Sequence, residues 1–134
     1  MVKRLIRVLG VVMVLLIALG VAMVAEFSRT DRIIAATEVD PSGIASILAD
    51  LPDGRYEGGF NPGKFVGAKV AVQVEGHQIT GIEIVEHNYG QGKPAEKITE
   101  SVIASQGLAV DSISGATVSS KVILIAIENA LRRR

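Results

Sequence analysis

Asp-Ser-Ile-Ser-Gly-Ala-Thr, residues 111–117, leads directly into an apolar run that ends at Leu131. The hydroxyl of Ser114 or of Thr117 can serve as an N-cap, because a side-chain oxygen there accepts a hydrogen bond from a free N–H group of the first helical turn. Gly115 permits the bend that such a start requires. The stretch therefore predicts that a helix begins close to Thr117.

The residues alone leave two uses open for this helix start. Capping is the ordinary role of hydroxyls in this position. The free N–H groups and the positive end of the helix dipole also favour a bound phosphate, which would then lie beside Thr117. Ser119 and Ser120, in the first turn, could donate hydrogen bonds to that phosphate. Both a structural cap and an anion site are compatible with the sequence.

The residues from 118 to 131 admit either a strand or a helix. Val122–Ile127 is rich in β-branched side chains, which favour strands. The run continues to Leu131 without a turn signal after a capped start, and this favours a helix. We expect the helix to bury Val122 and much of the Ile123–Ile127 run against a sheet.

Apolar positions upstream predict that sheet. They recur at every second residue from Val66 to Val74, which is the period of a strand with one face on a core. Glu75-Gly76-His77 has the composition of a hairpin turn, and residues 55–60 form a shorter strand. These elements predict an antiparallel meander.

The returning strand of this hairpin covers residues 79–87. Ile82 and Ile84 are expected on its buried face, so strict alternation places His87 on the opposite face. A lone histidine there is ordinarily a surface or turn residue. No second histidine or carboxylate follows at ligand spacing, so the sequence predicts no metal site.

Two further helices are expected. Asp40 followed by Pro41 is a strong helix start, and that helix ends near Leu51. Pro94 opens the second one, with Gly107 as its C-cap. Together with the meander they predict an α+β fold, in which a small antiparallel sheet packs with helices.

The N-terminal segment has the character of a membrane helix. Val8–Ala25 contains 18 residues without a charge, enough with its neighbours to reach about 30 Å as a helix. Basic residues precede it, namely Lys3, Arg4 and Arg7, and all 14 acidic residues follow it. This asymmetry predicts a single-pass protein of the cell membrane with a cytoplasmic N-terminus and an extracytoplasmic domain. A cleaved signal peptide is the alternative; Ala25 suits its cleavage site but Met23 does not, which favours an uncleaved signal anchor.

Composition excludes several functions. Cysteine is absent, so the chain offers no disulfide, thiolate metal site or cysteine nucleophile. Without its three N-terminal basic residues, the chain holds 11 basic and 14 acidic residues. Such a balance gives no electrostatic case for a nucleic-acid partner. Any redox chemistry must come from an added group.

The 111–117 stretch resembles the flavinylation motif of the small FMN-binding domain family, found in sodium-pumping NADH:quinone reductases and Rnf-type electron-transport complexes. The resemblance extends from about Leu51 to Leu131. It includes Asp53-Gly54-Arg55-Tyr56-Glu57-Gly58 and the hairpin that ends in Ile84-Val85-Glu86-His87-Asn88.

This resemblance implies that a flavin transferase joins FMN, through its phosphate, to Thr117. It also implies that His87 and Asn88 donate hydrogen bonds to the flavin. For Asp111 it implies a role in shaping the loop or in holding magnesium during the transferase reaction, whereas an Asx turn is the plainer role. The candidate cofactor-binding residues are Asp111, Ser114, Gly115, Ala116, Thr117, Ser119, His87 and Asn88.

The expected organisation has three parts: a signal anchor or transmembrane helix at residues 1–27, a juxtamembrane helical linker at 28–50, and an FMN-binding domain at 51–134. The implied protein is an electron carrier or redox-complex subunit rather than a stand-alone catalyst. Its partners would be a membrane electron donor or quinol system and a downstream redox acceptor. Two alternatives remain, namely an interaction module of a membrane complex with non-covalent or no flavin, and an anchored envelope protein without a cofactor.

Overall fold

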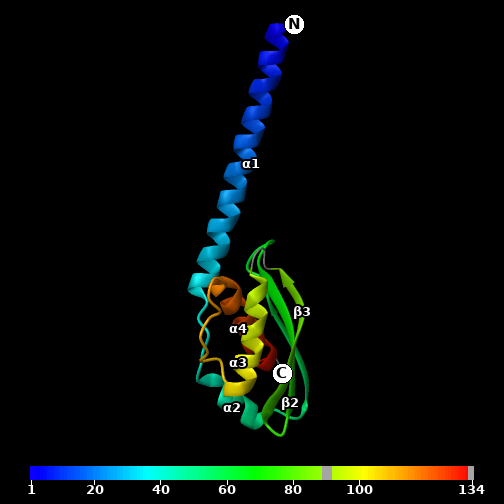
Figure 1. Cartoon of the computed structure of the whole chain (residues 1–134), viewed down its shortest axis with the longest axis vertical. Coiled ribbons are helices and arrows are strands. Elements are labelled where there is room, and N and C mark those ends of the chain that lie inside the picture. The colour runs from blue at the N-terminus through cyan, green and yellow to red at the C-terminus, as the bar shows by residue number, and fades with distance from the viewer. Residues whose placement is uncertain (89–91, 133–134) are drawn as a thin grey trace.

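The computed structural model describes residues 1–88 and 92–132 of the 134-residue chain. A long N-terminal helix leads into a small α+β domain with a three-stranded antiparallel sheet, as predicted (Figure 1). The elements are α1 (Val2–Ala36), α2 (Gly43–Asp50), β1 (Gly54–Phe60), β2 (Gly67–Glu75), β3 (Gln78–Asn88), the 3-10 helix η1 (Lys93–Lys97), α3 (Ile98–Ser105) and α4 (Thr117–Arg132).

Helix α1 is long and apolar enough to cross a membrane, with a mean hydropathy of 3.0 over its most apolar 18-residue window. It is one continuous helix that passes residue 27 without a break. Only its C-terminal part meets the domain, where Thr30 and Ile34 are buried. The helix that would span the membrane is therefore also packed on the folded domain.

The sheet has the order β1-β2-β3. Ala68, Val70, Val72 and Val74 are all buried, which confirms the predicted alternation. The hairpin between β2 and β3 turns at Gly76 and His77, whose φ angles are +57° and +62°. Two successive positive φ values define a type I′ turn, which suits the twist of an antiparallel hairpin.

Helix α4 lies across β1 and β2 and fills the core. Val122 and the whole of Ile123–Ile127 are buried, so the residues that could have formed a strand are helical, as predicted. Gly58 of β1 lies directly under α4, where an added Cβ would meet the backbone of Ala126 and Ala130. Glycine here lets the helix approach the sheet closely.

Strand β3 contains two bulges, and the second one changes the face on which its last residues lie. Val74 pairs with Ile79 but Gln73 pairs with Gly81, and the second bulge leaves Val85 without a partner residue on β2. His87 therefore pairs with Ala68, on the inward face. The prediction that His87 lies on the face away from Ile82 and Ile84 is wrong, because an inserted residue reverses the alternation.

Two helix ends also differ from the predictions. Asp40 accepts hydrogen bonds from the N–H groups of Ser42 and Gly43, both at 3.1 Å, so it caps a turn and α2 begins at Gly43 rather than at Pro41. Gln106, not Gly107, adopts the left-handed conformation after α3, with φ +53°.

The side chain of Gln106 accounts for this position. Its amide nitrogen donates to the carbonyl oxygens of Ile79 (2.8 Å) and Ile103 (2.7 Å), and its amide oxygen accepts from the N–H of Ile79 (2.7 Å). These three hydrogen bonds join the end of α3 to β3. They offset the cost of a left-handed conformation in a residue other than glycine.

Candidate flavin site at the start of α4

The turn before α4 is held by a serine inside the helix. Gly115 has φ +77°, and the N–H of Ala116 donates to the carbonyl oxygen of Ile113 at 2.9 Å. The buried hydroxyl of Ser120 donates to the carbonyl oxygen of Ala116 (2.8 Å) and accepts from the N–H of Ile113 (3.0 Å). Ser120 thus fixes the 113–116 turn from the first helical turn that follows it.

Neither expected cap forms. Ala116 precedes the helix and Thr117 is its first residue, while the side chains of Ser114 and Thr117 are exposed and make no hydrogen bond within the part of the chain that the structure describes. The prediction that Ser114 or Thr117 caps the helix is wrong. Ser120 accepts from the N–H of Ile113, which lies before the helix, so it stabilises the turn and does not cap the first helical turn. Within the same residues, the N–H groups of Thr117, Val118 and Ser119 also find no acceptor. The helix start therefore has hydrogen-bond donors to spare.

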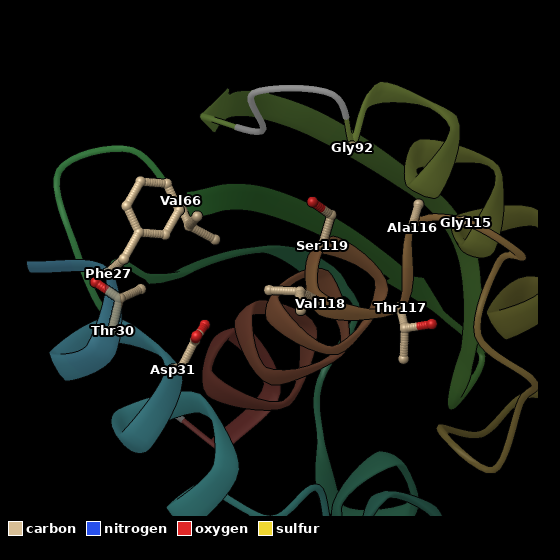
Figure 2. A pocket seen from close by; sticks show the side chains of 10 residues that line it. All are labelled: Phe27, Thr30, Asp31, Val66, Gly92, Gly115, Ala116, Thr117, Val118 and Ser119. Atoms are coloured by element: carbon tan, nitrogen blue, oxygen red, sulfur yellow. The ribbon is translucent and has the colours of Figure 1, made fainter. Parts of the chain in front are cut away.

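A pocket of about 500 Å³ lies between this helix start and α1. Volumes of this size are typical of sites for small molecules and cofactors. Figure 2 shows its lining, to which α1, the residue before β2, the residue before η1 and the start of α4 all contribute. The lining residues are Phe27, Thr30, Asp31, Val66, Gly92, Gly115, Ala116, Thr117, Val118 and Ser119. We refer to it as the α1–α4 pocket.

The walls of the α1–α4 pocket combine apolar and polar groups. Phe27, Val66 and Val118 supply apolar surface, whereas Asp31 brings a carboxylate from α1. In the view of Figure 2, Val118 points towards Thr30 and Asp31, and the hydroxyl of Thr117 points away from them. The pocket can thus hold a flat apolar group near its centre and an anion near the N–H groups of the helix start.

Two buried polar residues, Thr30 and Ser119, belong to this lining, and each is 6% exposed. The hydroxyl of Thr30 donates to the carbonyl oxygen of Glu26, whereas the hydroxyl of Ser119 makes no hydrogen bond among residues 1–88 and 92–132. Figure 2 shows the side chain of Ser119 directed towards Gly92. The hydroxyl oxygen is not one of the fully buried polar atoms that lack a partner, so it can meet water or a polar ligand that enters the pocket.

The structure brings together half of the predicted site residues. Gly115, Ala116, Thr117 and Ser119 line the α1–α4 pocket, whereas Asp111, Ser114, His87 and Asn88 do not. Asp111 is exposed and makes no hydrogen bond in the described part of the chain, so the expected Asx turn is absent.

His87 and Asn88 have other surroundings. The side chain of His87 is 2% exposed, and its Nδ1 lies 3.1 Å from a carboxylate oxygen of Glu96. The amide of Asn88 donates to Glu86 at 3.2 Å. Their hydrogen bonds to the flavin stay a prediction; the bulge at Val85 turns His87 to the inward face.

Sequence reasoning missed the α1 side of the site. Phe27 belongs to the expected transmembrane segment, and Thr30 and Asp31 belong to the expected linker. No local pattern marks them as pocket residues. Their role depends on the tertiary contact between α1 and the start of α4. Val66 and Val118 were expected only as core or helix residues.

The FMN-binding domain family matches residues 63–132. The chain belongs to this family. The matched region begins in the loop before β2 and ends with α4, so it includes the whole turn that leads to Thr117 and excludes α1. No curated protein matches the sequence.

The residues of this FMN-binding domain fit the cofactor that its family name implies. FMN carries a phosphate, a polar ribityl chain and a flat ring system. The spare N–H groups of Thr117, Val118 and Ser119 suit the phosphate, and the hydroxyl of Ser119 suits a polar oxygen. The apolar walls suit the ring. The chain is thus a flavin-binding module with a pocket at the start of α4.

Proposed function

We propose that this domain carries FMN joined through its phosphate to the hydroxyl oxygen of Thr117. The observation that supports the proposal is the placement of Thr117, which is exposed at the first position of α4 and lines the α1–α4 pocket. An exposed hydroxyl is accessible to a flavin transferase. The same helix start offers N–H donors that suit the phosphate oxygens of the product.

Attachment of FMN requires a hydroxyl that reacts at phosphorus and groups that hold the product. The hydroxyl oxygen of Thr117 forms the bond to phosphorus and gives up its proton, while a leaving group departs from the phosphorus of the flavin donor. The N–H groups of Val118 and Ser119 would hold the phosphate oxygens, and Phe27 and Val66 would cover the ring. When bound, FMN supplies reversible electron transfer, which the protein tunes through its hydrogen bonds and charges.

The wider function that we propose is electron transfer at the membrane. Helix α1 would anchor the domain in the membrane, with the N-terminus in the cytoplasm and the domain outside. The electron donor would be a membrane dehydrogenase or quinol system, and a further redox protein would accept the electrons. A covalent bond suits this location, because a flavin that dissociated outside the cell would be diluted and lost.

The test of attachment is flavin fluorescence on a denaturing gel. The full chain is produced with a flavin transferase, as wild type and as Thr117→Ala and Ser114→Ala variants. We expect a fluorescent band for the wild type and for Ser114→Ala, and none for Thr117→Ala. Thr117 is exposed without a hydrogen bond in the described structure, so its replacement changes the free energy of unfolding by less than about 0.5 kcal/mol.

Other outcomes would lead to other functions. Flavin absorbance in the native wild-type protein without a fluorescent band would show non-covalent binding. A wild-type protein without flavin, even with the transferase present, would favour an interaction module. For topology, a reporter fused after Arg134 is expected to be active only outside the cytoplasm, and activity inside the cell would contradict the proposed location.

A further inference from the structure

Two aromatic side chains are stacked on the surface beside the α1–α4 pocket. The rings of Phe27 in α1 and Phe65 in the β1–β2 loop lie with centroids 6.2 Å apart and an interplanar angle of 9°. Each residue is 50% exposed. Lys64, which precedes Phe65 in the loop, is also exposed. Phe27, Lys64 and Phe65 are called the aromatic cluster below.

The aromatic cluster lies where the charge-free part of α1 ends. Phe27 follows Ala25, the last residue of the uncharged run, by two positions in an unbroken helix. At 1.5 Å of rise per residue it lies about 3 Å beyond that run. This is the level at which hydrocarbon gives way to lipid headgroups in a spanning helix.

The β1–β2 loop is fixed at the same level by a close contact with α1. The hydroxyl of Thr30 donates to the carbonyl oxygen of Glu26 at 2.9 Å, and Thr30 fills the space beside Gly63 that a Cβ would need. Figure 1 shows the loop end of the sheet directed towards the N-terminal part of α1, whereas the β2–β3 turn lies at the opposite end of the domain. The loop end of the domain is thus the end nearest to the uncharged run.

The chemistry of the cluster matches a lipid surface. Phenylalanine, like tryptophan and leucine, is one of the side chains that interfacial helices bury at the boundary between headgroups and acyl chains. A lysine beside them can extend its charge to the lipid phosphates. A water-exposed pair of phenylalanines would otherwise contribute apolar surface with no partner.

We propose that Phe27, Lys64 and Phe65 contact the surface of the membrane that α1 spans, so that the α1–α4 pocket opens at the lipid headgroups. This proposal rests on the proposed membrane span, but not on the flavin. The pocket shares Phe27 with the cluster, and its Val66 directly follows Phe65. A redox partner confined to the lipid would therefore reach the pocket without crossing the aqueous phase.

The absence of tryptophan from the chain allows a direct test. Single tryptophans are introduced into the full chain by Phe65→Trp, Lys64→Trp, Gln78→Trp and Val14→Trp. Each variant is reconstituted in phosphatidylcholine vesicles with or without bromine on the upper acyl chain. Emission is compared between the two lipids, so that quenching by a bound flavin cancels. Lys64→Trp preserves the stacked phenylalanines if Phe65→Trp alters folding.

We expect brominated lipid to remove roughly half of the emission of Phe65→Trp and Lys64→Trp, because a side chain at the interface lies close to the bromine. Gln78→Trp, at the far end of β3, should lose almost none, and Val14→Trp in the span should be quenched. Quenching of Val14→Trp alone would overturn the surface contact and preserve the span. No quenching of Val14→Trp would refute both, and equal quenching at residues 65 and 78 would refute the oriented contact.

Discussion

The C-terminal end of α4 is closed by ion pairs and by contact with β1, whereas its N-terminal end carries exposed hydroxyls beside a pocket. At the closed end, Arg132 meets Glu128 at 2.8 Å and Asp40 at 3.1 Å, and the N–H of Asp40 donates to Glu128 at 3.4 Å. At the open end, the first N–H groups and Ser119 find no partner among the described residues. The same helix therefore has one end held by ion pairs and one end with unused hydrogen-bond donors, where we propose that the flavin binds.

The largest effect on stability is expected from adding a side-chain atom where β1 and α4 are in close contact. In the Gly58→Ala variant the new Cβ would overlap the backbone of Ala130, which cannot move without displacing the helix. We expect the free energy of unfolding to fall by about 3 kcal/mol, the upper part of the range for overpacked cores. Thermal unfolding of the full chain in one detergent measures the loss.

Gly54→Ala is the matched control for this substitution. Gly54 lies in the same strand, but a Cβ there would meet only the ring of Tyr56 at 3.8 Å or more. Its effect should be small. Equal stability of the two variants would show that the packing of the C-terminal half of α4 on β1 does not depend on close contact at Gly58.

Substitutions of Ser119 and Ser120, at the N-terminal end of α4, should distinguish an effect on stability from an effect on flavin binding. Ser120→Ala removes the acceptor for the N–H of Ile113 and the donor to Ala116, so we expect a loss of about 2 kcal/mol in unfolding free energy. Ser119→Ala removes a hydroxyl with no partner in the described chain and should change stability by less than about 0.5 kcal/mol.

Among the protein molecules that remain folded, Ser119→Ala should lose more flavin than Ser120→Ala. Ser119→Ala should retain less flavin after transferase treatment than the wild type, as measured by absorbance per mole of protein. If Ser119→Ala loses stability but carries normal flavin, Ser119 is a structural residue and does not belong to the flavin site.

The smallest effect concerns acid stability at the closed end. Hydrogen bonds from the Ser42 hydroxyl, the N–H groups of Ser42 and Gly43, and the Arg132 guanidinium lower the pKa of Asp40 from its ordinary value of 3.8. Because the folded pKa is depressed, the stabilisation is present above pH 3.8 and is lost as the pH falls through the lower folded pKa.

We therefore expect Asp40→Asn to lower the melting temperature at neutral pH and to have no effect once the wild-type carboxyl is protonated. Melting curves from neutral to strongly acidic pH measure this convergence. Asp50→Asn, at an exposed carboxylate without a hydrogen bond in the described structure, is the control. A constant difference between wild type and Asp40→Asn at every pH would contradict the role of charge at this end.

Local patterns predicted most of the fold. The alternation of Val66–Val74 and the uninterrupted run to Leu131 each depend on neighbours in the sequence, so the strand β2 and the helix α4 were both correct. The position of His87 was not predictable in this way. A bulge adds one residue without a compositional signal, and one residue is enough to move a side chain to the other face.

The candidate site was predictable only on its α4 side. The 111–117 stretch predicts a helix start, and the bend expected at Gly115 is present, since this residue has a positive φ. Phe27 and Asp31 enter the site through contacts with residues nearly ninety positions away, which no local pattern encodes. The hydrogen bond from the N–H of Ile113 to Ser120 was missed for a related reason, because it depends on a turn whose shape only the structure shows.

The most direct test of the central claim is the mass of the peptide that carries the open end of α4. Tryptic digestion of wild-type protein made with the transferase should release residues 98–121, which contain Thr117 together with Ser112, Ser114, Ser119 and Ser120. We predict that this peptide is heavier by the mass of FMN less one water, and that fragmentation places the added mass on Thr117. The same mass on Ser119 or Ser120, or an unmodified peptide from a protein that still holds flavin, would contradict the account.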